Sequence, residues 1–359
     1  MFTRKIHGAF LLASLLELTL AQDTKKKGEI NMDNGPLAYQ PSIAGNVIFG
    51  ILYFVLGVAF SYHIHVHRSR WAICLPAGAI ASAVGFFMRP TIDADDLQLG
   101  PFIASNILVI ASPSAFLAFN YMLYGRFITA IDPKFGNVST NASTTTLAED
   151  GTKQPKGSLR EPSKFSFIPP LIVGRIFIIS DISTFMVQVV AGSMQGQAGD
   201  DNPELANIGD KLFLAAVSVQ GLSYCLFTLL LTVALMRLVA DRRSNKSRAL
   251  EGGMLGLGKQ TTFIAVGFYI SSLFIILRSV YRVVEYTQGH QGYLISHEVY
   301  LFILDAAPLV LAIGIWSFIW PTILLDRIAS ETRALDSSQT NTSSVHHNNN
   351  SRSDWVPLV

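Results

Sequence analysis

The chain has 359 residues, of which half are hydrophobic and only 14% are charged, against about a quarter in a typical soluble protein. Its formal net charge of +2 creates no field that would attract a polyanion, which excludes nucleic-acid binding as the main activity. Two cysteines, Cys74 and Cys225, provide neither a disulfide framework nor a CxxC metal site. This composition predicts an integral membrane protein.

The first 21 residues have the layout of a secretory signal peptide. Arg4 and Lys5 precede an apolar run over residues 8–21 that ends in small residues. We therefore predict a signal peptide over residues 1–21 and an extracellular segment over residues 22–42. The alternative is an uncleaved amphipathic helix at the N-terminus.

Seven apolar stretches follow along the chain. Each approaches or exceeds the roughly 18–20 residues that a helix needs to cross a bilayer, where the backbone must satisfy its own hydrogen bonds. The stretches are residues 43–62, 71–88, 101–124, 168–190, 211–236, 261–283 and 299–320. The sequence therefore predicts an all-α integral membrane protein, with a seven-transmembrane-helix bundle over residues 43–321.

Lysine and arginine alternate between the loops that join these stretches. Residues 63–70, 125–167 and 237–260 are rich in basic side chains, and the intervening loops are poor in them. Because basic loops stay in the cytoplasm, we predict an external N-terminus and a cytoplasmic C-terminus. The polar residues 322–359 are expected to form a disordered cytoplasmic tail. Five glycosylation sequons fall in segments predicted to be cytoplasmic, and the loop charges outweigh them: Asn137, Asn141, Asn245, Asn341 and Asn349.

One segment imitates a phosphate-binding loop. Gly253, Gly258 and Lys259 have the spacing of that motif, but Gln260 occupies the position of the magnesium-binding Ser or Thr. No strand is expected before it, as the motif requires. We interpret the segment as a glycine-rich turn and expect no ATPase activity.

A histidine pair imitates a metal site. His63 and His67 are four residues apart on one predicted helix, which is the spacing of metal ligands. A zinc hydrolase would need a further histidine, but His290 and His297 fall on the opposite predicted face of the membrane. We therefore expect titratable interfacial histidines, with no metal, no cofactor and no enzymatic activity.

Ionisable and amide side chains within the predicted spans are the candidate site. Charges are costly in lipid, so they usually face a partner or a polar cavity. The candidates are Asp181, Gln188, Arg278, Arg282, Glu285, Glu298 and Asp305. Within each predicted span, the candidates are separated by about four or seven residues, which places them on one face of its helix. Arg278 is expected to pair with Asp305 or Asp181 about two turns inside the membrane.

Two interpretations of this charged layer remain open. It could be a structural connection that holds the predicted fourth, sixth and seventh helices together. It could instead line an outward-facing cavity that binds a cationic headgroup, such as the amine of a sphingoid base. One arginine can serve both roles.

The last two spans resemble a known family. The residues that carry the resemblance are 278–285, Gly289, Gly292, His297, Glu298, Asp305, Pro308 and Pro321. This block resembles the fungal lipid-translocating exporter family, the aminocholesterol-resistance proteins. The resemblance implies seven spans, export of sphingoid-base-like lipids and resistance to toxic amphiphiles. Ser82 stands where the family usually has an acid, which departs from its pattern.

Three functions compete at this stage. The leading hypothesis is a translocator of lipids or cationic amphiphiles in a plasma or internal membrane, with membrane lipids as its other partners. The alternative is a seven-helix receptor or sensor of lipid stress, although the absence of any lysine after Lys259 excludes a retinal Schiff base in the last span. A membrane hydrolase is disfavoured by the positions of the histidines. The sequence carries no signal for an oligomeric state.

Overall fold

In the computed structural model, most of the described residues lie in helices. The structure describes residues 41–91, 99–132, 163–166, 168–197, 203–244, 257–288, 293–294 and 297–334. Its contacts divide the chain into two compact units. Unit 1 comprises Met1–Phe119, Phe177–Leu226 and Tyr269–Phe318, and unit 2 comprises Asn120–Ile176, Phe227–Phe268 and Ile319–Val359.

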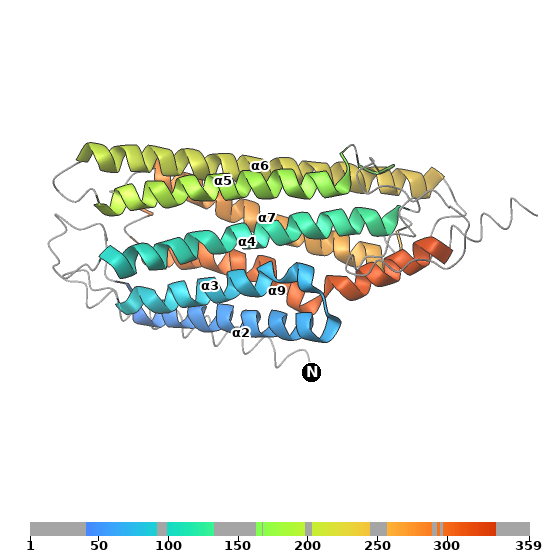
Figure 1. The fold of residues 1–359 in the computed structure, drawn as a ribbon, viewed down its shortest axis with the longest axis horizontal. Coiled ribbons are helices and arrows are strands. Elements are labelled where there is room, and N and C mark those ends of the chain that lie inside the picture. Colours follow the sequence, from blue (N-terminus) through green and yellow to red (C-terminus); the bar gives the residue numbers. More distant parts are fainter. Residues whose placement is uncertain are drawn as a thin grey trace, which may run out of the picture. The chain divides into compact units, whose positions relative to one another are not determined.

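The described residues contain helices and no strand (Figure 1). The helices are α2 (Ile43–His67), α3 (Cys74–Met88), α4 (Leu99–Ile131), α5 (Pro170–Gln197), α6 (Pro203–Ser244), α7 (Lys259–Thr287), α8 (Glu298–Tyr300) and α9 (Ala307–Phe318). Short 3-10 turns η1 (Arg70–Ala72) and η2 (Arg89–Thr91) flank α3, and a π-helical segment, η6 (Leu301–Ala306), joins α8 to α9.

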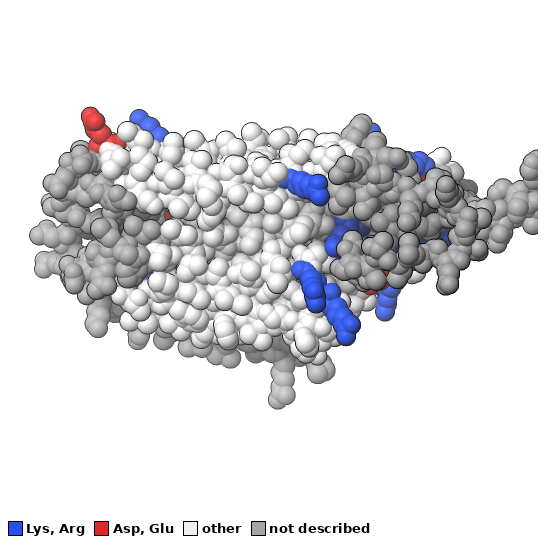
Figure 2. Space-filling model, viewed as in Figure 1, with Lys and Arg blue, Asp and Glu red and all other residues white. Residues whose placement is uncertain are grey.

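Seven helical segments are long and apolar enough to cross a membrane. They are Ile43–His67, Arg70–Thr91, Ala104–Ile131, Ile172–Gln195, Glu204–Ser244, Lys259–Thr287 and Glu298–Phe318. Much of the described surface in Figure 2 carries no charged side chain, as contact with lipid requires. The prediction of an all-α protein with seven spans is therefore confirmed. The orientation of its termini stays a prediction.

An aromatic layer in unit 1 joins α2 to α3 and η6. The rings of Phe49 and Phe302 stack with their centroids 5.2 Å apart, and those of Tyr53 and Phe86 stack at 5.6 Å. The Tyr53 hydroxyl donates a hydrogen bond of 3.1 Å to the Ala306 carbonyl. This bond satisfies a buried hydroxyl and fixes η6 against α2.

Small residues of α3 allow a close approach to α4 in unit 1. A Cβ atom at Gly85 would lie 2.7 Å from Val109 Cγ2, and one at Gly78 would lie 3.1 Å from the Ser112 carbonyl. A helix contact of this closeness needs glycine. Four-residue spacing from Gly85 predicts Ala77 on the same packing face, but the structure exposes Ala77. The seven-residue spacing of Gly78 and Gly85 describes the contact instead.

Pro113 interrupts the hydrogen-bond pattern within α4. Proline has no N–H group to donate to the carbonyl four residues earlier, at Val109. The Ser112 hydroxyl donates to that carbonyl at 3.1 Å. A polar side chain thus replaces the missing backbone bond inside a membrane span.

Unit 2 has its own aromatic core, built by α4, α6 and α7. The Phe227 ring contacts those of Tyr121 and Tyr124 edge to face, with centroids 4.7 and 5.6 Å apart. Phe127 and Phe268 make a similar contact at 6.2 Å. Such pairs stabilise a core by about 0.5–1.5 kcal/mol beyond the area they bury.

The predicted tail differs from the structure in its first residues. Residues 321–334 are helical, although disorder was expected from residue 322. The physical reason is an apolar face, because Leu325, Ile328 and Ala329 recur at helical spacing and are buried. The rest of the predicted tail, the signal segment 1–21, residues 22–40 and all five sequons lie outside the described residues.

Candidate functional site

Unit 1 contains a buried cluster of two arginines and two carboxylates. Arg278, Arg282 and Glu285 share one face of α7, because they are separated by four and three residues. Asp305 lies opposite them in η6 and is only 2% exposed. These four residues are called the ionic cluster below.

Asp305 is the centre of the ionic cluster. Arg282 donates to it through two parallel bonds, Nε to Oδ1 at 2.8 Å and Nη2 to Oδ2 at 2.7 Å. Nε of Arg278 lies 2.9 Å from Oδ1. Both oxygens of Asp305 are therefore engaged by guanidinium groups, in the forked geometry that makes an Arg–carboxylate pair strong.

Glu285 completes the ionic cluster. Its Oε2 lies 3.1 Å from Nη1 of Arg282, and its Oε1 accepts a hydrogen bond of 3.0 Å from the Tyr281 hydroxyl. Two positive and two negative groups balance formally. Such a neutral and hydrogen-bonded set is the form in which charges can persist in an apolar span.

The backbone around Asp305 is π-helical rather than α-helical. The Ala307 N–H group bonds to the Phe302 carbonyl, five residues earlier. Pro308 follows and has no N–H group to continue a regular ladder. A π-helical turn inside a membrane helix is rare and often lies at a functional site. Here it presents the Asp305 side chain to α7.

Glu298 lies in a different part of unit 1. Its Oε2 accepts a hydrogen bond of 2.7 Å from the Ser42 backbone N–H, and its Oε1 accepts one of 2.8 Å from Asn46 Nδ2. The carboxylate thus meets the N-terminus of α2, where the helix dipole favours a negative charge. Glu298 anchors α8 to α2, whereas the sequence had grouped it with Asp305.

An amide chain links three helices next to the ionic cluster. Gln188 of α5 donates through Nε2 to Oε1 of Gln220 in α6 at 2.8 Å, and Gln220 Nε2 donates to Ser114 Oγ in α4 at 3.1 Å. Each bond replaces water that a membrane interior cannot supply. Asp181, one of the seven candidates, is buried in α5 at 2% exposure.

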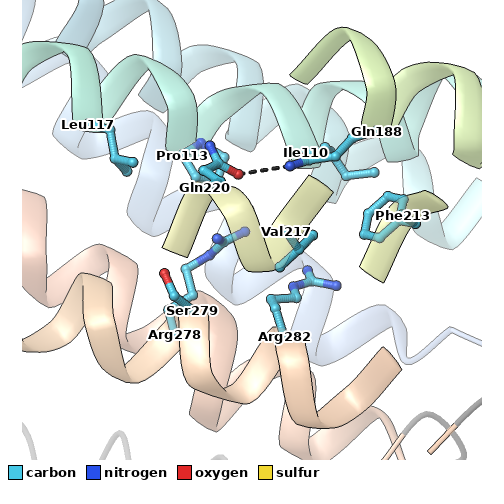
Figure 3. A pocket seen from close by; sticks show the side chains of 10 residues that line it. All are labelled: Ile110, Pro113, Leu117, Gln188, Phe213, Val217, Gln220, Arg278, Ser279 and Arg282. Carbon is cyan, nitrogen blue, oxygen red and sulfur yellow. Dashed lines mark hydrogen bonds between the residues drawn. The ribbon is translucent and has the colours of Figure 1, made fainter. Parts of the chain in front are cut away.

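A small cavity lies between the amide chain and the ionic cluster (Figure 3). Its lining combines arginine and amide side chains with apolar ones. The lining residues are Ile110, Pro113, Leu117, Gln188, Phe213, Val217, Gln220, Arg278, Ser279 and Arg282. Its volume of about 20 Å³ is enough for about one water molecule.

The structure brings together most of the residues that the sequence selected. Arg278, Arg282, Glu285 and Asp305 form one cluster, and of the two partners expected for Arg278, Asp305 and Asp181, the structure places Asp305 at 2.9 Å. Gln188 joins Arg278 and Arg282 around the cavity. Sequence reasoning missed Tyr281, Gln220, Ser114 and Asn46, because neutral polar side chains are common in membrane helices. Tyr281 lies four residues before Glu285, and this spacing could have identified it.

The described residues contain no group of three His, Cys, Asp or Glu side chains that could hold a metal ion. The rings of His63 and His67 stack with centroids 6.0 Å apart. Lys259, part of the imitation phosphate loop, begins α7.

Seven spans with a buried ionic cluster and an internal polar cavity define a multi-pass membrane protein. The family described as "RTA1 like protein" matches residues 75–147 and 159–328. The chain belongs to this family, and the predicted resemblance is confirmed.

Curated relatives extend this assignment. Protein RTA1 of Saccharomyces cerevisiae is 24% identical over 319 residues, which cover 82% of this chain and 87% of the relative. Protoporphyrin uptake protein 1 of the same yeast is 24% identical over 236 residues, 66% and 64% of the two chains. Sphingoid long-chain base transporter RSB1 is 28% identical over 173 residues, 42% and 45% of the two chains. No solved structure matches this chain. The family and these names support a membrane function related to lipids.

Proposed function

We propose that this protein translocates lipid-like amphiphiles, such as sphingoid long-chain bases, and thereby confers resistance to toxic amphiphiles. The observation that carries the proposal is the ionic cluster beside the cavity in a chain of seven spans. Polar groups are retained in spans where they face one another or a path for a polar group. The name of the relative RSB1 supports a long-chain base as the first substrate to test.

The helices around the cavity suit a site that changes its width. Pro113 lies in the cavity wall at the point where α4 lacks a backbone hydrogen bond. A helix bends most easily at such a position. The cavity as it stands holds about one water molecule, so a headgroup would enter only after its walls separate.

The proposal is tested with the purified full chain in liposomes that contain a fluorescently labelled sphingoid base. We expect faster transfer of the label between leaflets than in protein-free liposomes, and a loss of at least tenfold in the Arg282→Gln variant. Lys164→Gln is the matched control, because it removes one positive charge from unit 2. Cellular resistance without any transfer in liposomes would contradict translocation and favour a receptor or sensor of lipid stress.

A further inference from the structure

The cavity of unit 1 has an uneven chemical lining. Two guanidinium groups, two amides and one hydroxyl contribute to its wall, whereas neither Asp305 nor Glu285 is among its lining residues. Figure 3 shows Arg278 and Arg282 extending from α7 toward the α6 side chains Val217 and Gln220. A ligand in this cavity therefore contacts the guanidinium groups of the ionic cluster and not its carboxylates.

Arg278 has hydrogen-bonding capacity left over. Its Nε lies 2.9 Å from Asp305 Oδ1 but makes no hydrogen bond there, and its terminal Nη1 and Nη2 groups have no hydrogen-bond acceptor among the described residues. Its side chain is 13% exposed and lines the cavity. Arg282, in contrast, uses Nε and Nη2 on Asp305 and Nη1 on Glu285. Arg278 is thus the side chain that can receive a ligand.

The carboxylates are not available to a cation. Both oxygens of Asp305 are held by arginines, and Glu285 is held by Arg282 and Tyr281. An amine in the cavity would have to displace a guanidinium group or lie against one. An ammonium and a guanidinium group at such short distance repel each other, and the repulsion is strongest in an apolar interior.

We propose that this cavity is a binding site for an oxyanion headgroup, a phosphate or a carboxylate, held by the terminal nitrogens of Arg278. The planar guanidinium group matches the spacing of two such oxygens. Gln188 and Gln220 present amides at the same wall. Ile110, Leu117 and Val217 surround these groups with apolar side chains, which suits a headgroup attached to a hydrocarbon chain. The inference rests on the proposed function for the lipid character of the ligand, but it assigns this site an anionic headgroup in place of the amine of a sphingoid base. The headgroup would enter only after the walls of the cavity separate, because the cavity as it stands holds about one water molecule.

Binding to purified protein in a nonionic detergent tests this inference without any transport. The probes share one chain and differ in headgroup charge: dodecyl phosphate, dodecanoate and dodecyltrimethylammonium, with inorganic phosphate as the headgroup alone. We expect the two anionic amphiphiles to raise the melting temperature and to bind at least tenfold more tightly than the ammonium. If inorganic phosphate binds as tightly as dodecyl phosphate, the site takes a free anion. If inorganic phosphate does not bind, the anion is the headgroup of a lipid.

Variants identify the site. Arg278→Gln should weaken dodecyl phosphate binding by about tenfold to a hundredfold, as expected for loss of a charge-assisted hydrogen bond. Lys164→Gln, which removes the same charge from unit 2, should bind as the unchanged protein does. If Arg278→Gln does not fold, Arg278→Lys is the second variant, because lysine retains the charge without the planar fork. It should bind dodecyl phosphate about tenfold more weakly than the unchanged protein does.

Two results would overturn the inference. One is tighter binding of dodecyltrimethylammonium than of either anionic probe. The other is dodecyl phosphate binding that is unchanged in both Arg278 variants. Either result would leave the proposed translocation intact, because that is measured by leaflet transfer of a sphingoid base. Absence of transfer together with Arg278-dependent phosphate binding would contradict translocation and leave the anion site in place.

Discussion

The two units use similar side chains in different surroundings. In unit 1, Arg282 and Asp305 are about nine-tenths buried and form two parallel bonds. In unit 2, the Lys164 ammonium pairs with Asp241, and the lysine side chain is 59% exposed. The first pair lies in apolar spans, whereas the second includes a segment before α5. The comparison indicates that the loss of stability on removing one partner depends on the burial of the pair more than on the number of ion pairs.

Unit 2 also shows how a carboxylate can organise a loop. Oδ2 of Asp132 accepts a bond of 2.6 Å from the Ser163 hydroxyl and one of 3.1 Å from the Lys164 backbone N–H. Asp132 is 3% exposed and follows directly after α4. These two partners of Asp132 are neutral donors, whereas the arginine partners of Asp305 are guanidinium groups. The two aspartates therefore differ in what a mutation would leave behind.

Replacement of Arg282 should have the largest effect. Arg282→Gln removes three bonds to Asp305 and Glu285 and leaves two carboxylates facing Arg278 alone. Loss of one member of a buried ion pair costs about 3–5 kcal/mol. We expect a strongly lowered melting temperature and abundance, measured in detergent and in membranes. A variant as stable as Lys164→Gln would contradict the importance of burial.

A double substitution separates structure from function in the ionic cluster. Arg282→Gln with Asp305→Asn removes both charges of the forked pair, so the uncompensated charge that destabilises either single variant is reduced. We expect the double variant to recover at least about 1 kcal/mol relative to the sum of the single changes, since residues in contact are coupled. Amphiphile transfer should stay lost if the cluster contributes to the path. Recovery of both stability and transfer would make the cluster structural alone.

Asp132→Ala should have an intermediate effect. It leaves the Ser163 hydroxyl and the Lys164 N–H without this acceptor, and a buried donor left unsatisfied costs about 1–3 kcal/mol. The control is Ser163→Ala, which removes only one of the two bonds and should cost less. Thermal unfolding compares the two variants. A larger effect for Ser163→Ala would contradict the central place of Asp132.

The positions of the spans could be predicted because apolarity is a property of each segment alone. It could also be predicted that one face of α7 carries Arg278, Arg282 and Glu285, because regular helical spacing determines that face. The tail from residue 322 was misjudged because its polar composition hid a short amphipathic pattern around Leu325 and Ile328.

The partners across helices could not be predicted in the same way. The depth of each side chain in the membrane follows from a rise of about 1.5 Å per residue only in a regular α-helix. The π-helical turn at Asp305 has a different geometry. Arg282 was therefore not identified as the main partner of Asp305. The contact of Glu298 with Ser42 joins residues 256 positions apart, and no local pattern indicates such a pair.

The smallest effect is expected from Lys164→Gln. The side chain of Lys164 is 59% exposed and that of Asp241 is 11% exposed, so the lysine keeps much of its hydration in the folded protein and its pairing with Asp241 gains little. Exposed pairs contribute only about 0.2–1 kcal/mol and are weakened further by salt. The backbone bond of Lys164 to Asp132 does not depend on the side chain, so the segment should keep its place. We expect a change in melting temperature close to the limit of measurement at 150 mM salt, and a slightly larger one at low salt. A loss comparable with that of Arg282→Gln would show that burial does not rank these pairs, and the comparison between the two units would fail.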